Sequence, residues 1–122
     1  MKLFDLEQQY RIGKKPDFTV GKKIIDLDFH FIEGIPFMLE ETNPKQMIEM
    51  VKSTGADTVM IYAKDHWGNV YHETKVAHKH KGVKIDLLGE WLKEAKKLNL
   101  KTIVFFSLMW DQYAAANNPT LG

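Results

Sequence analysis

Thr58-Val59-Met60-Ile61-Tyr62-Ala63 is the stretch that decides the fold, because it is almost continuously apolar and rich in β-branched residues. Such runs are typical of strands that are buried on both faces of a parallel sheet. A second run, at residues 101–106, is apolar in the same way. Residues 24–29 alternate apolar with acidic side chains, which predicts a third strand with one apolar face.

Two helices are predicted between these strands. Asn43 is a good N-cap, Pro44 suits the first helical position, and Gly55 suits a left-handed helix end. Asp86 caps the second helix, and Asn99 is placed to end it. Their apolar faces are formed by Met47, Ile48 and Val51 and by Leu88, Trp91, Leu92, Ala95 and Leu98. Helical crossovers of this length predict parallel strands and therefore an α/β fold.

The predicted sheet of about three parallel strands and two crossover helices occupies residues 22–122. Residues 1–21 are polar and are predicted to form an N-terminal arm with a short helix at 4–11. The loop at 64–84 is expected to hold a short strand near Val70-Tyr71, and a further helix is expected to begin at 114–116. Three strands leave two unpaired edges, so we expect a piece of a larger sheet or a chain that pairs with its own copy.

Charge and composition exclude several classes of protein. Seventeen Lys and Arg residues nearly cancel sixteen Asp and Glu residues, so the net charge of +1 provides no general attraction to nucleic acids or anionic membranes. No stretch has the length of a membrane span, and no signal peptide is visible. The absence of Cys excludes disulfides and thiolate metal sites. We expect no nucleic-acid or membrane partner, no cofactor and a cytoplasmic location.

Polar and aromatic side chains follow the carboxyl end of every predicted strand. Ligands bind at this edge of parallel α/β sheets because the loops converge there. Indole rings stack on the C–H faces of sugars while neighbouring polar groups bond the hydroxyls, so the pattern favours a carbohydrate site. The competing interpretation is that polar loops are simply polar and that a tryptophan covers the core. The candidate binding residues are His30, Lys64, Asp65, His66, Trp67, Trp110 and Asp111.

A metal site is the weaker alternative. His72, His78 and His80 lie in one loop, and Glu73 or Asp65 could complete a two-histidine, one-carboxylate set. Adjacent lysines would repel a cation, so solvated histidines are the favoured interpretation. A histidine-ligated, metal-dependent hydrolase is retained only as a third hypothesis.

Three segments together resemble the strand ends of glycoside hydrolases related to α-L-fucosidases. They are Leu27-Asp28-Phe29-His30, Tyr62-Ala63-Lys64-Asp65-His66-Trp67-Gly68-Asn69 and Phe106-Ser107-Leu108-Met109-Trp110-Asp111. The resemblance is closest to a fucosidase-like group described as hypothetical glycosyl hydrolases, and it spans about residues 24–119. Lys81 stands where that group often has proline.

The resemblance implies a (β/α)₈ barrel of which this chain would supply the first three strands. It implies that His30 and His66 contact the sugar and that Trp110 lines the pocket. The family's nucleophile follows the fourth strand and its acid/base comes later, so the catalytic residues would lie outside this chain. The leading hypothesis is therefore a sugar-binding N-terminal portion, inactive alone. The alternative is a stand-alone carbohydrate-binding or self-associating α/β module.

Overall fold

The computed structural model describes residues 21–35, 37–118 and 120. Apart from Gly21, the predicted arm at 1–21 and its helix at 4–11 lie outside these ranges. No helix within them is long and apolar enough to cross a membrane. The elements are β1 (Ile24–Asp26), α2 (Phe37–Glu40), α3 (Pro44–Ser53), β2 (Thr58–Lys64), β3 (Asn69–Val70), β4 (His78–Lys79), α4 (Leu87–Lys97), β5 (Lys101–Phe106) and α5 (Gln112–Asn117).

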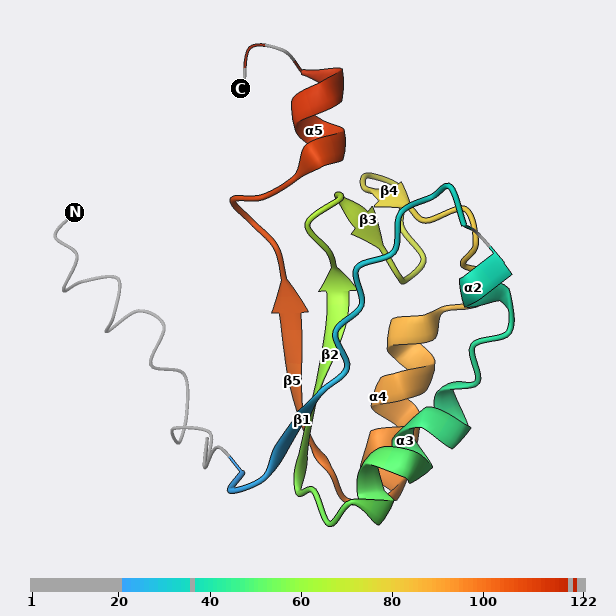
Figure 1. Cartoon of the computed structure of the whole chain (residues 1–122), viewed down its shortest axis with the longest axis vertical. Helices are drawn as coiled ribbons and strands as arrows, with labels where there is room; N and C mark the ends of the chain where they lie inside the picture. The colour runs from blue at the N-terminus through green and yellow to red at the C-terminus, as the bar shows by residue number, and fades with distance from the viewer. Residues whose placement is uncertain (1–20, 36, 119, 121–122) are drawn as a thin grey trace, which may run out of the picture.

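Strand β2 is the centre of the sheet. It pairs in parallel with β1 on one side and with β5 on the other, and α3 and α4 form the two crossovers. The prediction of three parallel strands with two crossover helices is confirmed. The end of β2 also pairs antiparallel with β3, which pairs in parallel with β4. Figure 1 shows β3, β4 and α5 gathered beyond the arrowheads of β2 and β5, at the carboxyl ends of the parallel strands.

The predicted helix boundaries are confirmed by their caps. The Asn43 side chain accepts the backbone N–H of Gln46 at 3.1 Å, and the Asp86 side chain accepts that of Gly89 at 2.9 Å. These bonds satisfy backbone donors that a helix N-terminus leaves free. Gly55 (φ 75°) and Asn99 (φ 52°) adopt the left-handed conformation expected after α3 and α4.

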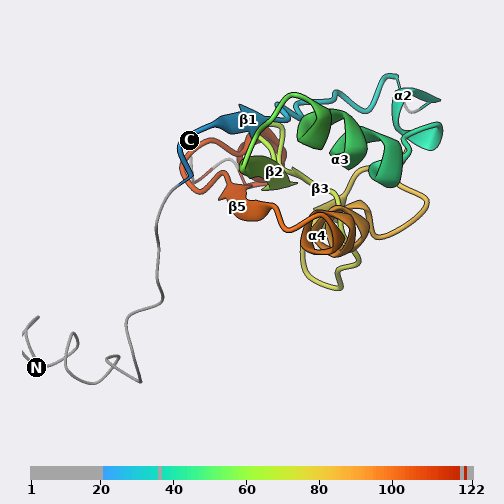
Figure 2. The same cartoon turned by 90° about the horizontal axis from the view of Figure 1, so that it is seen from below.

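The hydrophobic core lies between the sheet and the helices α3 and α4, which Figure 2 shows on the same side of the sheet. Val59 and Ile61 of β2 are fully buried there. Trp91 of α4 is also fully buried, and its ring meets that of Phe29 at 4.6 Å, edge to face. Alternate residues of β2 thus anchor the layer that supports the strand ends.

The first strand is shorter than predicted. It ends at Asp26 instead of continuing through residue 29, although the N–H of Leu27 still donates to the carbonyl of Met60. Beyond that point the hydroxyl of Tyr71 lies 3.3 Å from the Phe29 carbonyl and accepts the N–H of Phe31. A side chain therefore replaces the sheet partner and holds the segment that carries His30.

The third parallel strand, β5, is apolar as predicted but is only partly covered. Val104 and Phe106 are each nearly half exposed, whereas β2 is mostly buried. The reason is that β5 pairs only with β2 and that no described helix after it packs on its face. In the described part of the chain, β1 and β5 therefore have the open edges that the sequence predicts.

Candidate functional site

The start of α5 docks on the turn between β2 and β3. The N–H of Gln112 donates to the carbonyl of His66 at 3.1 Å, and the N–H of Tyr113 donates to the carbonyl of Trp67 at 3.0 Å. The Asp111 carboxylate caps the helix by accepting the N–H of Ala114 at 2.8 Å. Backbone donors of α5 are thus satisfied by the strand-end loop, which brings the ends of β2 and β5 together.

Gly68 makes this docking possible. Its φ of 89° is in the left-handed region, where glycine is favoured. A Cβ at this position would lie 2.8 Å from the Cβ of Tyr113 and would clash with the Asp111 carboxylate. The turn therefore requires glycine for its conformation and for the close approach of α5.

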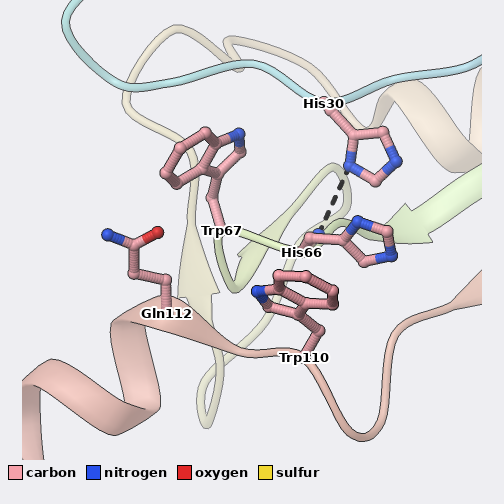
Figure 3. A pocket seen from close by; sticks show the side chains of 5 residues that line it. All are labelled: His30, His66, Trp67, Trp110 and Gln112. Atoms are coloured by element: carbon pink, nitrogen blue, oxygen red, sulfur yellow. Dashed lines mark hydrogen bonds between the residues drawn. The ribbon is translucent and has the colours of Figure 1, made fainter.

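A hollow of about 280 Å³ opens at this edge of the sheet, and Figure 3 shows the side chains around it. This volume is near the lower end of the range for small-molecule sites. The lining includes a histidine after β1, a His-Trp pair after β2 and a tryptophan after β5. These residues, with Gln112, are His30, His66, Trp67 and Trp110.

Three of the rings form a continuous stack. The rings of His30 and His66 are 4.2 Å apart with an interplanar angle of 29°, and those of His66 and Trp110 are 5.5 Å apart at 25°. Trp110 nevertheless remains 69% exposed. The structure thus brings together residues that the sequence places far apart, and it leaves most of the Trp110 side chain exposed.

Some polar side-chain atoms around the hollow have partners within the protein, and others have none among the described residues. His30 is held internally, because its Nδ1 lies 3.4 Å from the His66 N–H and its Nε2 lies 3.0 Å from an Asp28 oxygen. Nδ1 is therefore the acceptor, and Nε2 carries a proton toward the carboxylate. Among the described residues, no hydrogen bond involves the remaining polar side-chain atoms of the lining, which belong to His66, Trp67, Trp110 and Gln112. These atoms are free to form hydrogen bonds with a ligand.

Asp65 does not line the hollow. It is fully buried and accepts the N–H of Asn69 at 2.9 Å and the hydroxyl of Tyr71 at 2.7 Å. Burial, followed by the hydrogen bond to Asp65, raises the pKa of Tyr71 far above its ordinary value, so the hydroxyl stays protonated and donates. The structure therefore places Asp65 as a support for the loops that carry His30 and His66.

Lys64 and Asp111 are also absent from the lining. Their side chains form an ion pair, and the Lys64 ammonium additionally donates to the Ser107 carbonyl at 3.2 Å. Partial burial raises the pKa of Asp111, but the hydrogen bonds from Lys64 and the Ala114 N–H outweigh it and leave the pKa below its usual value. The pair fixes the loop between β5 and α5, which presents Trp110.

Two of the three loop histidines have separate partners, and the buried Nδ1 of the third, His72, has none among the described residues. His78 Nε2 lies 2.9 Å from a Glu33 oxygen, whereas His80 is fully buried and its Nδ1 accepts the Gly82 N–H at 3.0 Å. No group of three side chains suited to a metal ion gathers in the parts of the chain that the structure covers. The geometry therefore gives no support to the three-histidine hypothesis.

Gln112 is the lining residue that sequence reasoning missed. The further helix was expected around residues 114–116, whereas α5 begins at Gln112. Asp111 is the signal that could have located it, since an aspartate N-cap places the next residue in the first turn.

Acid is expected to loosen this edge of the sheet before it unfolds the core. In the folded chain, the pKa values of Glu33 and Asp111 lie below their usual values. Burial raises the pKa of Glu33, but hydrogen bonds from Lys81 and His78 outweigh it. Burial likewise raises the pKa of Asp111, but hydrogen bonds from Lys64 and Ala114 outweigh it. A lowered folded-state pKa stabilises at higher pH, and this contribution is lost as the pH falls through that pKa.

Below about pH 4, the NMR signals of Tyr113 and Trp110 should therefore shift while those of buried Trp91 remain native. Simultaneous change at all three rings would contradict a local transition.

Comparison with known proteins places these residues in a family context. The model of a family described as hypothetical glycosyl hydrolase 6 matches residues 43–120. Among solved structures, α-L-fucosidase isoenzyme 2 from Paenibacillus thiaminolyticus is similar with a TM-score of 0.74 and 26% identity over 80% of this chain. An α-L-fucosidase of family GH29 from Bacteroides thetaiotaomicron and a bacterial fucosidase with a monovalent iminocyclitol inhibitor each share the fold, with a TM-score of 0.54 and 22% identity over 66% of the chain. No match was found among curated proteins.

The sequence resemblance to fucosidase-like glycosyl hydrolases is confirmed by these matches, and so is the partial-barrel fold class. The mostly parallel open sheet corresponds to a fragment of a fucosidase (β/α)₈ domain. The chain spans only 15% of the length of the first of these structures and 19% of the other two.

Proposed function

The chain belongs to the hypothetical glycosyl hydrolase 6 family, and from this premise we propose that it is the N-terminal sugar-binding portion of a fucosidase-like glycoside hydrolase barrel. Its ligand is an α-L-fucoside, held in the hollow at the carboxyl ends of β1, β2 and β5. The choice of sugar rests on the similarity to an α-L-fucosidase at 26% identity.

The observation that carries the proposal is the stack of His30, His66 and Trp110 beside polar atoms that have no protein partner among the described residues. A flat aromatic surface suits the C–H face of a pyranose ring. The free nitrogen and amide groups of His66 and Gln112 suit its hydroxyls. Both kinds of group line the same hollow, so one ring can use them together.

Binding without hydrolysis is the second part of the proposal. Retaining glycosidases need two carboxyl groups roughly 5 to 5.5 Å apart, one of them free to attack. The carboxylates at this edge have other partners: Asp28 pairs with His30, Glu33 with His78 and Asp111 with Lys64, while Asp65 is buried with Tyr71. This supports the proposal that the nucleophile and the acid/base are supplied from outside the segment.

Replacing Trp110 by alanine is expected to weaken the binding of methyl α-L-fucopyranoside by roughly two- to tenfold. The exposed indole would lose its stacking on the sugar, and aromatic stacking contributes about 0.5–1.5 kcal/mol. Titration followed by NMR on the 122-residue chain measures the change.

Met109→Ala is the matched control, because Met109 is the adjacent residue, is fully exposed and does not line the hollow. Equal weakening by both substitutions, or no binding by the parent chain, would contradict the sugar site. Turnover of an aryl α-L-fucoside by the parent chain would contradict the assignment of catalysis to other segments. Self-association through the open edges of β1 and β5 stays a separate prediction.

A further inference from the structure

Trp110 stands at the end of a short loop that side-chain packing alone does not hold. The loop follows β5 and runs from Ser107 to Trp110. At its tip Leu108 is 81% exposed and Met109 is fully exposed, while the Trp110 side chain is 69% exposed. Ser107 is the buried member of the loop. The direction in which the indole points is therefore set by the bonds of the loop itself.

Ser107 makes three hydrogen bonds that tie this loop together and to the end of β2. Its N–H donates to the Lys64 carbonyl at 3.2 Å, and its own carbonyl accepts the Lys64 ammonium at 3.2 Å. Its hydroxyl donates to the Trp110 carbonyl at 2.7 Å, the usual length of an O–H···O bond. This last bond spans the loop and fixes the peptide unit that follows the Trp110 Cα.

We propose that Ser107 is a positioning residue of the sugar site: its hydroxyl holds the Trp110 backbone so that the indole stacks on the ring of His66. In Figure 3 the indole lies beside this ring, and the two centroids are 5.5 Å apart. The inference rests on the proposed function and assigns part of the sugar affinity to a residue that does not line the hollow. A preformed indole face loses less conformational entropy on binding than a mobile one.

The other bonds in this region hold the residues that follow Trp110. The Asp111 carboxylate pairs with Lys64 and caps α5, so it fixes the start of the helix. Among the described residues, no hydrogen bond other than the one from Ser107 involves Trp110. Removal of the Ser107 hydroxyl therefore leaves the Trp110 peptide without a partner and lets the indole turn away from the stack.

The test is a double-mutant cycle on the 122-residue chain, measured by NMR titration with methyl α-L-fucopyranoside. Ser107→Ala should weaken binding by roughly two- to threefold, because the indole then samples orientations that do not stack. In the Trp110→Ala background the same substitution should leave the affinity unchanged, because no indole remains to be positioned.

Ser53→Ala is the matched control. The Ser53 hydroxyl also donates at 2.7 Å to a carbonyl three residues away, that of Met50, but it lies in α3 and does not line the hollow. This substitution removes the same kind of bond and should leave the sugar affinity unchanged.

An NMR signature separates positioning from a general loss of stability. Stacked rings shift each other's proton signals, so Ser107→Ala should move the ring signals of Trp110 and His66 toward those of unstacked side chains. The ring signals of Trp91, which is fully buried in the core, should stay in place.

Three results would overturn the inference while leaving the hollow as a sugar site. They are equal weakening by Ser107→Ala with and without the Trp110 indole, unchanged ring signals in Ser107→Ala, and an equal loss of affinity in Ser53→Ala. Failure of the parent chain to bind the fucoside would overturn the proposed function instead. The ring signals would then still show whether Ser107 holds the indole against His66.

Discussion

Replacing Trp91 by alanine is expected to lower the free energy of unfolding by about 3–5 kcal/mol, the range observed when a buried large aromatic residue is truncated. Trp91 is fully buried on α4, and its ring meets that of Phe29 at 4.6 Å. The substitution removes the apolar contacts that the Trp91 ring makes in the core. It leaves a cavity that the surrounding helices and sheet can fill only in part. Urea unfolding followed by circular dichroism measures the loss.

Trp91→Phe is the control that separates packing from hydrogen bonding. The indole Nε1 is buried and has no hydrogen-bond partner among the described residues, so phenylalanine removes volume without breaking a bond. The expected cost is therefore well below that of alanine. Equal destabilisation by both variants would contradict the cavity argument, and a negligible effect of alanine would contradict the burial of Trp91 itself.

Local sequence signals were sufficient for the parallel layer because the relevant forces are local and periodic. The apolar run of β2, the Asn43 cap and the left-handed Gly55 each determine their own segment. The end of β1 was not predictable in the same way. Its alternation continues to residue 29, but the Tyr71 hydroxyl replaces the sheet partner after Leu27, and Tyr71 is far away in the sequence.

In the candidate site, too, some residues can be predicted from the sequence and others cannot. The sequence predicts four of the lining residues, because each follows a strand end and the strand ends of a parallel sheet share an edge. They are His30, His66, Trp67 and Trp110. The position of Gln112 depends instead on a long-range backbone hydrogen bond to His66, which has no sequence pattern. The pairing of His78 with Glu33 likewise joins residues 45 positions apart.

Asp65 illustrates a more specific difficulty. Its position after β2, among Lys64, His66 and Trp67, favours a role in ligand binding. The structure instead buries it completely, because the short strand β3 turns back over the end of β2 and brings Asn69 and Tyr71 to the carboxylate. Sequence periodicity indicates which residues are near a strand end, but it does not indicate which of them the following turn will cover.

Replacing Asp65 by alanine is expected to lower the free energy of unfolding by about 3 kcal/mol. The change leaves the Asn69 N–H buried without its acceptor and leaves the Tyr71 hydroxyl only the longer bond to the Phe29 carbonyl at 3.3 Å, and an orphaned buried group costs about 1–3 kcal/mol. It should also weaken the proposed binding of an α-L-fucoside, because the Tyr71 hydroxyl that accepts the Phe31 N–H positions the segment bearing His30. Urea unfolding and NMR titration measure the two effects.

The double variant Asp65→Ala/Tyr71→Phe tests whether these groups act as one unit. Tyr71→Phe removes the hydroxyl and so also removes the donor that Asp65→Ala deprives of its shorter hydrogen bond. The two substitutions together should therefore cost less than the sum of the single costs, by about 0.5–3 kcal/mol. Strict additivity would mean that Tyr71 and Asp65 contribute independently. The hydrogen bond between them could then not be what couples the loop of His30 to the end of β2.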